Sequence, residues 1–458
     1  MIGCKKMQTT KQNNSIYKKY IVLHTLMCVL LSVGTFSPLS QMATISIILI
    51  VLVELYEPVE QSLYLIIMLA PFENLISLNG RKVFFIVFFV FLMKVLIKKA
   101  VIRGKNKTCL LFAVALVGLE IFNEFMLPAV STSPYALLNV SFYILFFFCV
   151  IHSADDIGFS LKTAILSFNI SILIVIVATF NSYGSFAAFM EKARQASYVF
   201  RLGNTTFDTL GGAMGIPLYA SLVLAFNVVY LTINKVKSII SDIYLFLMIA
   251  ISVAFGVLSV SRAFYLCFIA FFGLYIVINL FQKKKYGFAV FVSILAILAI
   301  VIFLTSDDYT WILGNLTSRM NEDAGVGIRG QIWMSCLEFL FKHPGRLLLG
   351  LSSNCYDQYG VVINQLFSWT AHNFVLDIIM SFGLVGFSML IYMFRHLLRI
   401  LRDRFGTMEA TITILPFITF MVFGLTALRT ATGKTWVYLV FTVYFIYTMR
   451  SKGNEFDT

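Results

Sequence analysis

Two histidines are the first candidates for acid–base chemistry in this sequence. Of its five histidines, only His343 and His372 fall in segments that we expect on the outer side of the membrane. His372 opens the stretch His-Asn-Phe-Val-Leu, where a long apolar run begins. Gly383 follows eleven residues later, about three helical turns, so we expect it on the same helix face, where another helix can approach closely. An imidazole with a pKa of about 6.5 at a helix mouth can act as a general base in an aqueous cleft. The alternative is structural: His372 caps a helix, and His343, directly before Pro344, ends one.

Arginine predominates in the same expected outer segments. Eight of the twelve basic residues there are arginines, whereas the expected inner segments hold mostly lysine. A planar guanidinium binds phosphate or carboxylate in a bidentate manner, so this bias indicates an anionic ligand on the outer face. Ordinary solvated or snorkelling side chains are the alternative for part of the set. The eight are Arg81, Arg194, Arg201, Arg262, Arg319, Arg329, Arg346 and Arg429.

Common catalytic motifs are missing from the sequence. It contains no Walker loop, no G-x-S-x-G, no metal-binding histidine pair, and no paired carboxylates at a spacing that we judged useful. We therefore expect no cofactor and no metal. A substrate acted on at the outer face must arrive already activated, because no nucleotide is available there.

The composition excludes a soluble protein. Of 458 residues, 59% are hydrophobic and 12% are charged, against about 25% charged in an average soluble domain. The net charge of +13 needs no nucleic-acid partner, since the lysine and arginine bias of cytoplasmic membrane loops accounts for it. We expect an all-α, polytopic transmembrane helix bundle.

Fourteen apolar segments approach the roughly 20 residues that a helix needs to cross a membrane. With the N-terminus inside, the cytoplasmic loops hold 23 of the 35 basic residues, which supports cytoplasmic termini. Three segments are short, so thirteen or twelve spans are alternatives. The segments are 20–37, 41–57, 62–79, 83–97, 108–127, 135–151, 160–180, 210–233, 239–258, 263–281, 286–305, 373–394, 411–428 and 435–449.

Two outer loops are long enough to have their own structure, about 181–209 and about 306–372. In the larger, apolar pairs repeat every four residues and end at His343, which predicts a short amphipathic helix on the outer membrane interface that covers a cavity. Cys336 and Cys355 share this loop, but their spacing does not require a disulfide. We divide the chain into an N-terminal bundle, 1–260, and a C-terminal module, 261–458. The apolar pairs are Ile332 and Trp333, Cys336 and Leu337, and Leu340 and Phe341.

Four short motifs occur in order across the second half of the chain. Together they resemble the C-terminal module of the O-antigen polymerase/ligase family, over about 262–386. Two arginines that each precede a glycine by eleven positions also fit the Wzy-type polymerases of that family: Arg201 with Gly212, and Arg319 with Gly330. The implied fold is that of GT-C-like membrane glycosyltransferases. The four motifs are Ser261-Arg262-Ala263, Arg329-Gly330-Gln331-Ile332-Trp333, His343-Pro344 with Gly350, and His372-Asn373-Phe374-Val375-Leu376 with Gly383.

The resemblance also implies a reaction. The donor is an oligosaccharide on undecaprenyl pyrophosphate, His372 is the general base, and Arg329 and Arg262 stabilise the departing pyrophosphate. The partners are this lipid-linked substrate, membrane lipid and, as a further candidate, a chain-length regulator protein. The implied location is the bacterial inner membrane, with the site facing the periplasm. The remaining candidates for substrate binding are Arg201, Arg319, Arg429, Asn373 and Asp377.

Other functions stay open at this point. Within the family, an O-antigen ligase would transfer the chain to lipid A core; we favour the polymerase because of the high helix count and the arginine–glycine pairs. A transporter or flippase of lipid-linked sugars is the alternative from another class. Transporters tend to show internal repeats and charges at mid-membrane. The sequence shows no such repeat, and its notable charges lie at helix mouths on one face.

Overall fold

The described part of the chain is helical apart from one small hairpin. The computed structural model describes residues 19–34, 41–78, 81–97, 107–126, 134–157, 160–188, 191, 212–233, 238–259, 261–282, 294, 297, 314, 327–353, 371–404, 408–427 and 432–452. The hairpin pairs β1 (Ser77–Leu78) antiparallel with β2 (Arg81–Lys82). The expected all-α class is confirmed for these residues.

The helices follow the apolar runs of the sequence, because a helix satisfies its backbone polar groups within a single segment. A first helix spans Lys19–Gly34. Those after it are α2 (Gln41–Tyr56), α3 (Val59–Leu69), the 3-10 turn η1 (Ala70–Phe72), α4 (Phe85–Ile97), α5 (Lys107–Phe125), α6 (Pro134–Ile157), α7 (Leu161–Ser182), α10 (Gly212–Ile233), α11 (Ile239–Leu258), α12 (Arg262–Gln282), α15 (Gly327–Lys342), α16 (Pro344–Leu349), α18 (Phe374–Arg404), α19 (Met408–Thr413), α20 (Leu415–Ala427) and α21 (Gly433–Lys452).

Four of these helices contain a stretch that is long and apolar enough to cross a membrane, judged by length and composition. They are Leu161–Asn181, Gly215–Ile233, Ile239–Leu258 and Phe374–Arg395. Eight further apolar helices among the described residues are shorter. The total of fourteen spans stays a prediction, and the span expected at 286–305 lies outside the described residues.

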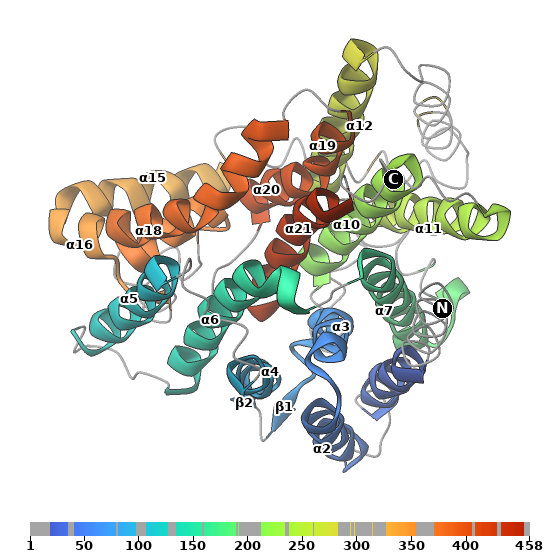
Figure 1. The fold of residues 1–458 in the computed structure, drawn as a ribbon, viewed down its shortest axis with the longest axis horizontal. Helices are drawn as coiled ribbons and strands as arrows, with labels where there is room; N and C mark the ends of the chain where they lie inside the picture. The colour runs from blue at the N-terminus through green and yellow to red at the C-terminus, as the bar shows by residue number, and fades with distance from the viewer. Residues whose placement is uncertain are drawn as a thin grey trace, which may run out of the picture.

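Helix α21 lies in the middle of the bundle (Figure 1). It packs on α3, α6, α18, α19 and α20. One hydrophobic core runs from Met27 in the first helix to Ile446 in α21, so residues from both halves of the chain share it. A second, smaller core joins α15, α16 and the start of α18 at the edge of the bundle.

Buried polar contacts link distant segments that the expected alternation of spans places on the same side. On the expected outer side, Glu73 accepts hydrogen bonds from the backbone N–H groups of Gly433 (2.8 Å) and Lys434 (3.0 Å). On the expected inner side, His24 Nε2 lies 2.6 Å from Glu57 Oε2. The alternation is therefore compatible with the packing.

The inner group corrects one expectation from the sequence. Glu54 and Glu57, at the end of α2, are buried together with His24. Lys94 Nζ lies 3.6 Å from Glu54 Oε1 and donates to Ser62 Oγ at 2.7 Å. Buried charged groups thus occur at both ends of the bundle, and the expectation that they lie on one face was wrong. Two carboxylates on one helix turn also contradict the expected absence of useful carboxylate pairs.

Candidate functional site

His372 occupies a tight turn directly before α18. Its backbone is left-handed, with φ of 51°, and its side chain is 5% exposed. The next residue, Asn373, caps the helix: its Oδ1 accepts from the N–H groups of Val375 (3.1 Å) and Leu376 (3.2 Å). Helix capping therefore does not occupy the imidazole of His372. We expected this ring in an aqueous cleft, but in the structure it is buried.

Helix α15 packs against this turn. Trp333 Nε1 donates to the carbonyl oxygen of Ala371 at 2.7 Å. Arg329 is half-buried in the first turn of α15 and precedes Trp333 by four residues, so the two share a helix face. The structure thus brings α15, one helical turn after Arg329, to the residue before His372.

The expected amphipathic helix is present as α15 and ends where predicted. His343 separates it from α16; its ring stacks on Phe339 and its Nδ1 lies 3.0 Å from the Phe339 carbonyl oxygen. The expected apolar stripe is buried only in part. Ile332, Cys336 and Leu340 are buried, whereas Leu337 and Phe341 are exposed. Cys336 is buried in the small core, and Cys355 lies outside the described residues.

Helix α18 is interrupted at Gly383, where α16 crosses it. Gly383 has φ of 65° and ψ of −174°, and a Cβ there would lie 2.2 Å from the Leu348 carbonyl oxygen. Gly350, with φ of 84°, approaches the backbone of α18 equally closely. A Cβ there would lie 2.3 Å from the Ser381 carbonyl oxygen. The close approach that we expected at Gly383 is confirmed, and its partner is the short helix α16 with the residues after it.

A comparison with known families identifies this region. Residues 245–391 match the family model Wzy_C, described as O-antigen ligase. These residues are similar to an O-antigen ligase domain. The match is consistent with the O-antigen polymerase/ligase family and does not distinguish polymerase from ligase. It indicates a membrane protein of the O-antigen ligase type. A search of curated proteins found no match.

Two further candidate residues lie inside the O-antigen ligase domain. Arg262 is half-buried at the first position of α12, which packs mainly on α20. Helix α20 in turn contacts α18, with the rings of Phe420 and Phe374 5.8 Å apart. Asp377 is buried in the first turn of α18, one turn after Asn373. The positive end of the helix dipole favours a carboxylate at this position.

Carboxylates from outside the O-antigen ligase domain also reach it, and the sequence reasoning missed them. Glu120 and Glu124 are buried one turn apart at the end of α5. Ser353 N–H donates to Glu120 Oε1 at 2.8 Å, and Ser352 Oγ donates to Glu124 Oε2 at 2.7 Å. The available signal was two glutamates four residues apart in an apolar run, since a charged side chain in a membrane helix is costly and needs a partner.

In the last expected outer turn, a carboxylate already occupies the N-terminus of α21. Glu73 accepts from the first two N–H groups of α21, those of Gly433 and Lys434. Its carboxylate thus takes the place that an anionic substrate would need at this helix N-terminus. This contact favours the ordinary loop role over phosphate binding for Lys434. Three candidates fall outside the described residues: Arg201, Arg319 and Arg429.

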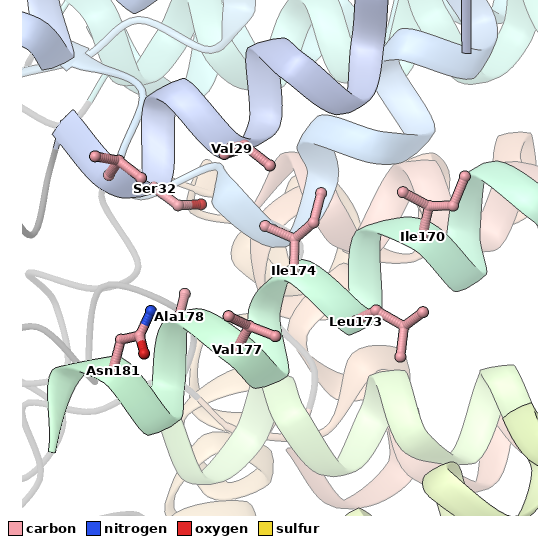
Figure 2. Close-up of a pocket in the computed structure, with 9 residues that line it drawn as sticks. Val29, Ser32, Ile170, Leu173, Ile174, Val177, Ala178 and Asn181 are labelled. Carbon is pink, nitrogen blue, oxygen red and sulfur yellow. The ribbon is translucent and has the colours of Figure 1, made fainter. Parts of the chain in front are cut away.

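An apolar hollow is lined by residues outside the matched range 245–391. Figure 2 shows it between the first helix and α7, with Ser32 and Asn181 at one end and aliphatic side chains along the rest. Its volume is about 480 Å³. In the part of the chain that the structure describes, no three His, Cys, Asp or Glu residues converge as metal ligands would.

Proposed function

We propose that this protein polymerises oligosaccharide repeat units carried on undecaprenyl pyrophosphate, at the periplasmic face of the inner membrane. His372 takes the proton from an acceptor hydroxyl, and the oxygen attacks the anomeric carbon of the donor sugar. The bond from that carbon to the pyrophosphate oxygen breaks, and undecaprenyl pyrophosphate leaves with the bonding electrons. Arg329 and Arg262 balance the charge that builds on the leaving group.

The position of His372 within the O-antigen ligase domain carries this proposal. The imidazole lies in a strained turn whose helix is already capped by Asn373. Trp333, one helical turn after Arg329 on α15, donates a hydrogen bond to the residue before His372. Strained turns of this kind persist where the surrounding structure holds them, and they occur often at active sites. A base and a half-buried cation on adjoining elements are what transfer from a pyrophosphate requires.

The remaining candidates have supporting roles in the proposal. Arg201, Arg319 and Arg429 are further contacts for the pyrophosphate or the sugars, and Asp377 orients a neighbouring base or arginine from within the membrane. Asn373 keeps His372 in place by capping α18. The excess of lysine and arginine in the expected inner loops supports cytoplasmic termini and a periplasmic site.

An O-antigen ligase is the second candidate, because the matching family model is described by that activity. The two activities share the donor and differ in the acceptor, which is another lipid-linked repeat unit for a polymerase and lipid A core for a ligase. Supplying purified protein with each acceptor in turn therefore separates them.

The test of the mechanism compares two histidines of the same expected outer loop. Purified protein in lipid vesicles receives lipid-linked repeat units, and product length is followed across a range of pH. His372→Ala is expected to lower the rate by about a hundred- to ten-thousandfold, the usual loss for a general base. His343→Ala is the matched control, because its ring ends α15 and stacks on Phe339. Long chains made by His372→Ala at nearly the parent rate would show that another group activates the acceptor.

A further inference from the structure

The segment Leu349–Ser353 is held by polar contacts along its whole length. It follows α16 and lies between α5 on one side and the interrupted part of α18 on the other. In Figure 1, α16, α18 and α5 gather at the same edge of the bundle. Each of the two neighbouring helices supplies its own set of hydrogen bonds to this segment.

Helix α18 contributes backbone carbonyl groups that lack their usual helical partners because the helix is interrupted at Gly383. The N–H of Leu351 donates to the Met380 carbonyl oxygen at 2.8 Å, and the N–H of Ser352 donates to that of Ser381 at 3.0 Å. In an uninterrupted helix these carbonyl groups would bond four residues ahead, beyond Gly383. The segment therefore completes the hydrogen bonding of the broken helix.

Helix α5 contributes side chains. Asn123 Nδ2 donates to the Leu349 carbonyl oxygen at 2.5 Å. Glu124 accepts from Ser352 Oγ, and Glu120 Oε1 accepts from both the N–H and the Oγ of Ser353. The α5 polar residues are all at most 2% exposed, so these contacts form away from water.

This segment is connected directly to the turn of His372. Leu351 and Ala371, the residue before His372, are both fully buried and belong to the same small core, with Met380 and Leu376 of α18. Displacement of Leu351 therefore changes the packing against which the His372 turn rests. Close-packed interiors transmit such shifts, because they contain little free volume.

We infer that Glu120 and Glu124 are positioning residues, which act through Ser352, Ser353 and Leu351 to fix the turn of His372. The inference rests on the proposed function and extends the site to α5, outside residues 245–391. Neither carboxylate needs to touch the substrate. Their effect is on the geometry of the base and hence on kcat, since a misplacement of about 1 Å can cost about a hundredfold in rate.

The structure offers a conservative variant at one of these positions. Among the described residues, Glu120 Oε2 accepts no hydrogen bond, and both contacts with Ser353 use Oε1. Glu120→Gln keeps an oxygen at the contacted position and breaks none of these bonds, whereas Glu120→Ala removes both. Glu338→Ala is the control for loss of a glutamate, because Glu338 is exposed on α15 and pairs with Lys342.

The first test measures kcat and KM of purified protein with lipid-linked repeat units. Glu120→Ala and Glu124→Ala are expected to lower kcat by about ten- to a hundredfold with little change in KM. Glu120→Gln and Glu338→Ala keep kcat near that of the parent. In a double-mutant cycle, Glu124→Ala combined with Ser352→Ala loses no more than Glu124→Ala alone, because the two changes remove one shared contact. Parent-like kcat in the alanine variants, losses that multiply, or a Gln variant as slow as Ala would each overturn the inference.

The second test needs no substrate, so it separates failure of the inference from failure of the proposed function. Hydrogen exchange is followed in peptides that cover Leu349–Ser353 and Ala371–Asn373. In Glu124→Ala, exchange is expected to rise in both, and in Glu338→Ala in neither. Unchanged exchange around His372 overturns the coupling whether or not the protein makes polysaccharide. If the parent makes no product and the coupling is present, the proposed function fails and the link from α5 to the turn stands.

Discussion

Replacing Gly383 by alanine tests the crossing of α16 and α18 directly. A Cβ at this position would lie 2.2 Å from the Leu348 carbonyl oxygen and 2.6 Å from the Leu349 nitrogen. Both are backbone atoms, so no rotation of a side chain can make room. The φ of 65° with a ψ of −174° is a conformation that is essentially restricted to glycine.

The expected cost follows from two contributions. Forcing a residue with a Cβ into this backbone region costs about 1–3 kcal/mol. If the crossing opens, the bonds from the N–H groups of Leu351 and Ser352 to α18 are lost, at about 0.5–1.5 kcal/mol each. The alanine variant should therefore be less stable by about 2–6 kcal/mol. Because the crossing supports the turn of His372, activity should fall as well.

The assay is thermal unfolding of the purified protein in detergent, followed by activity at a temperature where the variant is folded. The matched control is Gly118→Ala in α5, where nothing lies within 4 Å of the added Cβ. That change should be neutral or stabilising by up to about 1 kcal/mol, since alanine favours a helix over glycine. A Gly383→Ala protein that unfolds at the same temperature as Gly118→Ala would refute the described crossing.

Two further predictions concern the expected outer loop. Arg329→Lys should lose most activity, about a hundredfold, while the protein level stays normal, because lysine cannot reproduce a bidentate contact with phosphate; full-length surface polysaccharide in this variant would argue against that contact. Reporter fusions at Gln331 should report an extracytoplasmic position, as the distribution of lysine and arginine requires, and a cytoplasmic signal there would reverse the orientation.

Local patterns in the sequence predicted local features of the site well. The end of α15 at His343 follows from the proline at the next position, and the start of α18 follows from His372-Asn373 before an apolar run. The close approach at Gly383 was also predicted. The first two depend on residues that are neighbours along the chain, which is where sequence patterns are informative.

Contacts between distant residues could not be predicted in the same way. Glu120 and Ser353 are 233 positions apart, and Glu73 and Gly433 are 360 apart. A glutamate inside an apolar run shows that a partner is needed, but the sequence does not say which residue it is. The positive φ of Gly383 is likewise imposed by the crossing chain, because the surrounding apolar run alone favours an unbroken helix.

The central place of α21 has a consequence for biosynthesis. Helix α21 follows all the other described helices along the chain, and Glu73, directly after η1, bonds to N–H groups that are made 360 residues later. Until then, the faces of α3, α6 and α20 that pack on α21 have no partner, and a buried carboxylate lacks its donors. The earlier helices can enter the membrane one by one, but the bundle can close only after α21 has been made. A nascent chain interrupted before Gly433 would therefore expose these faces and a costly charge to the quality-control proteases of the membrane.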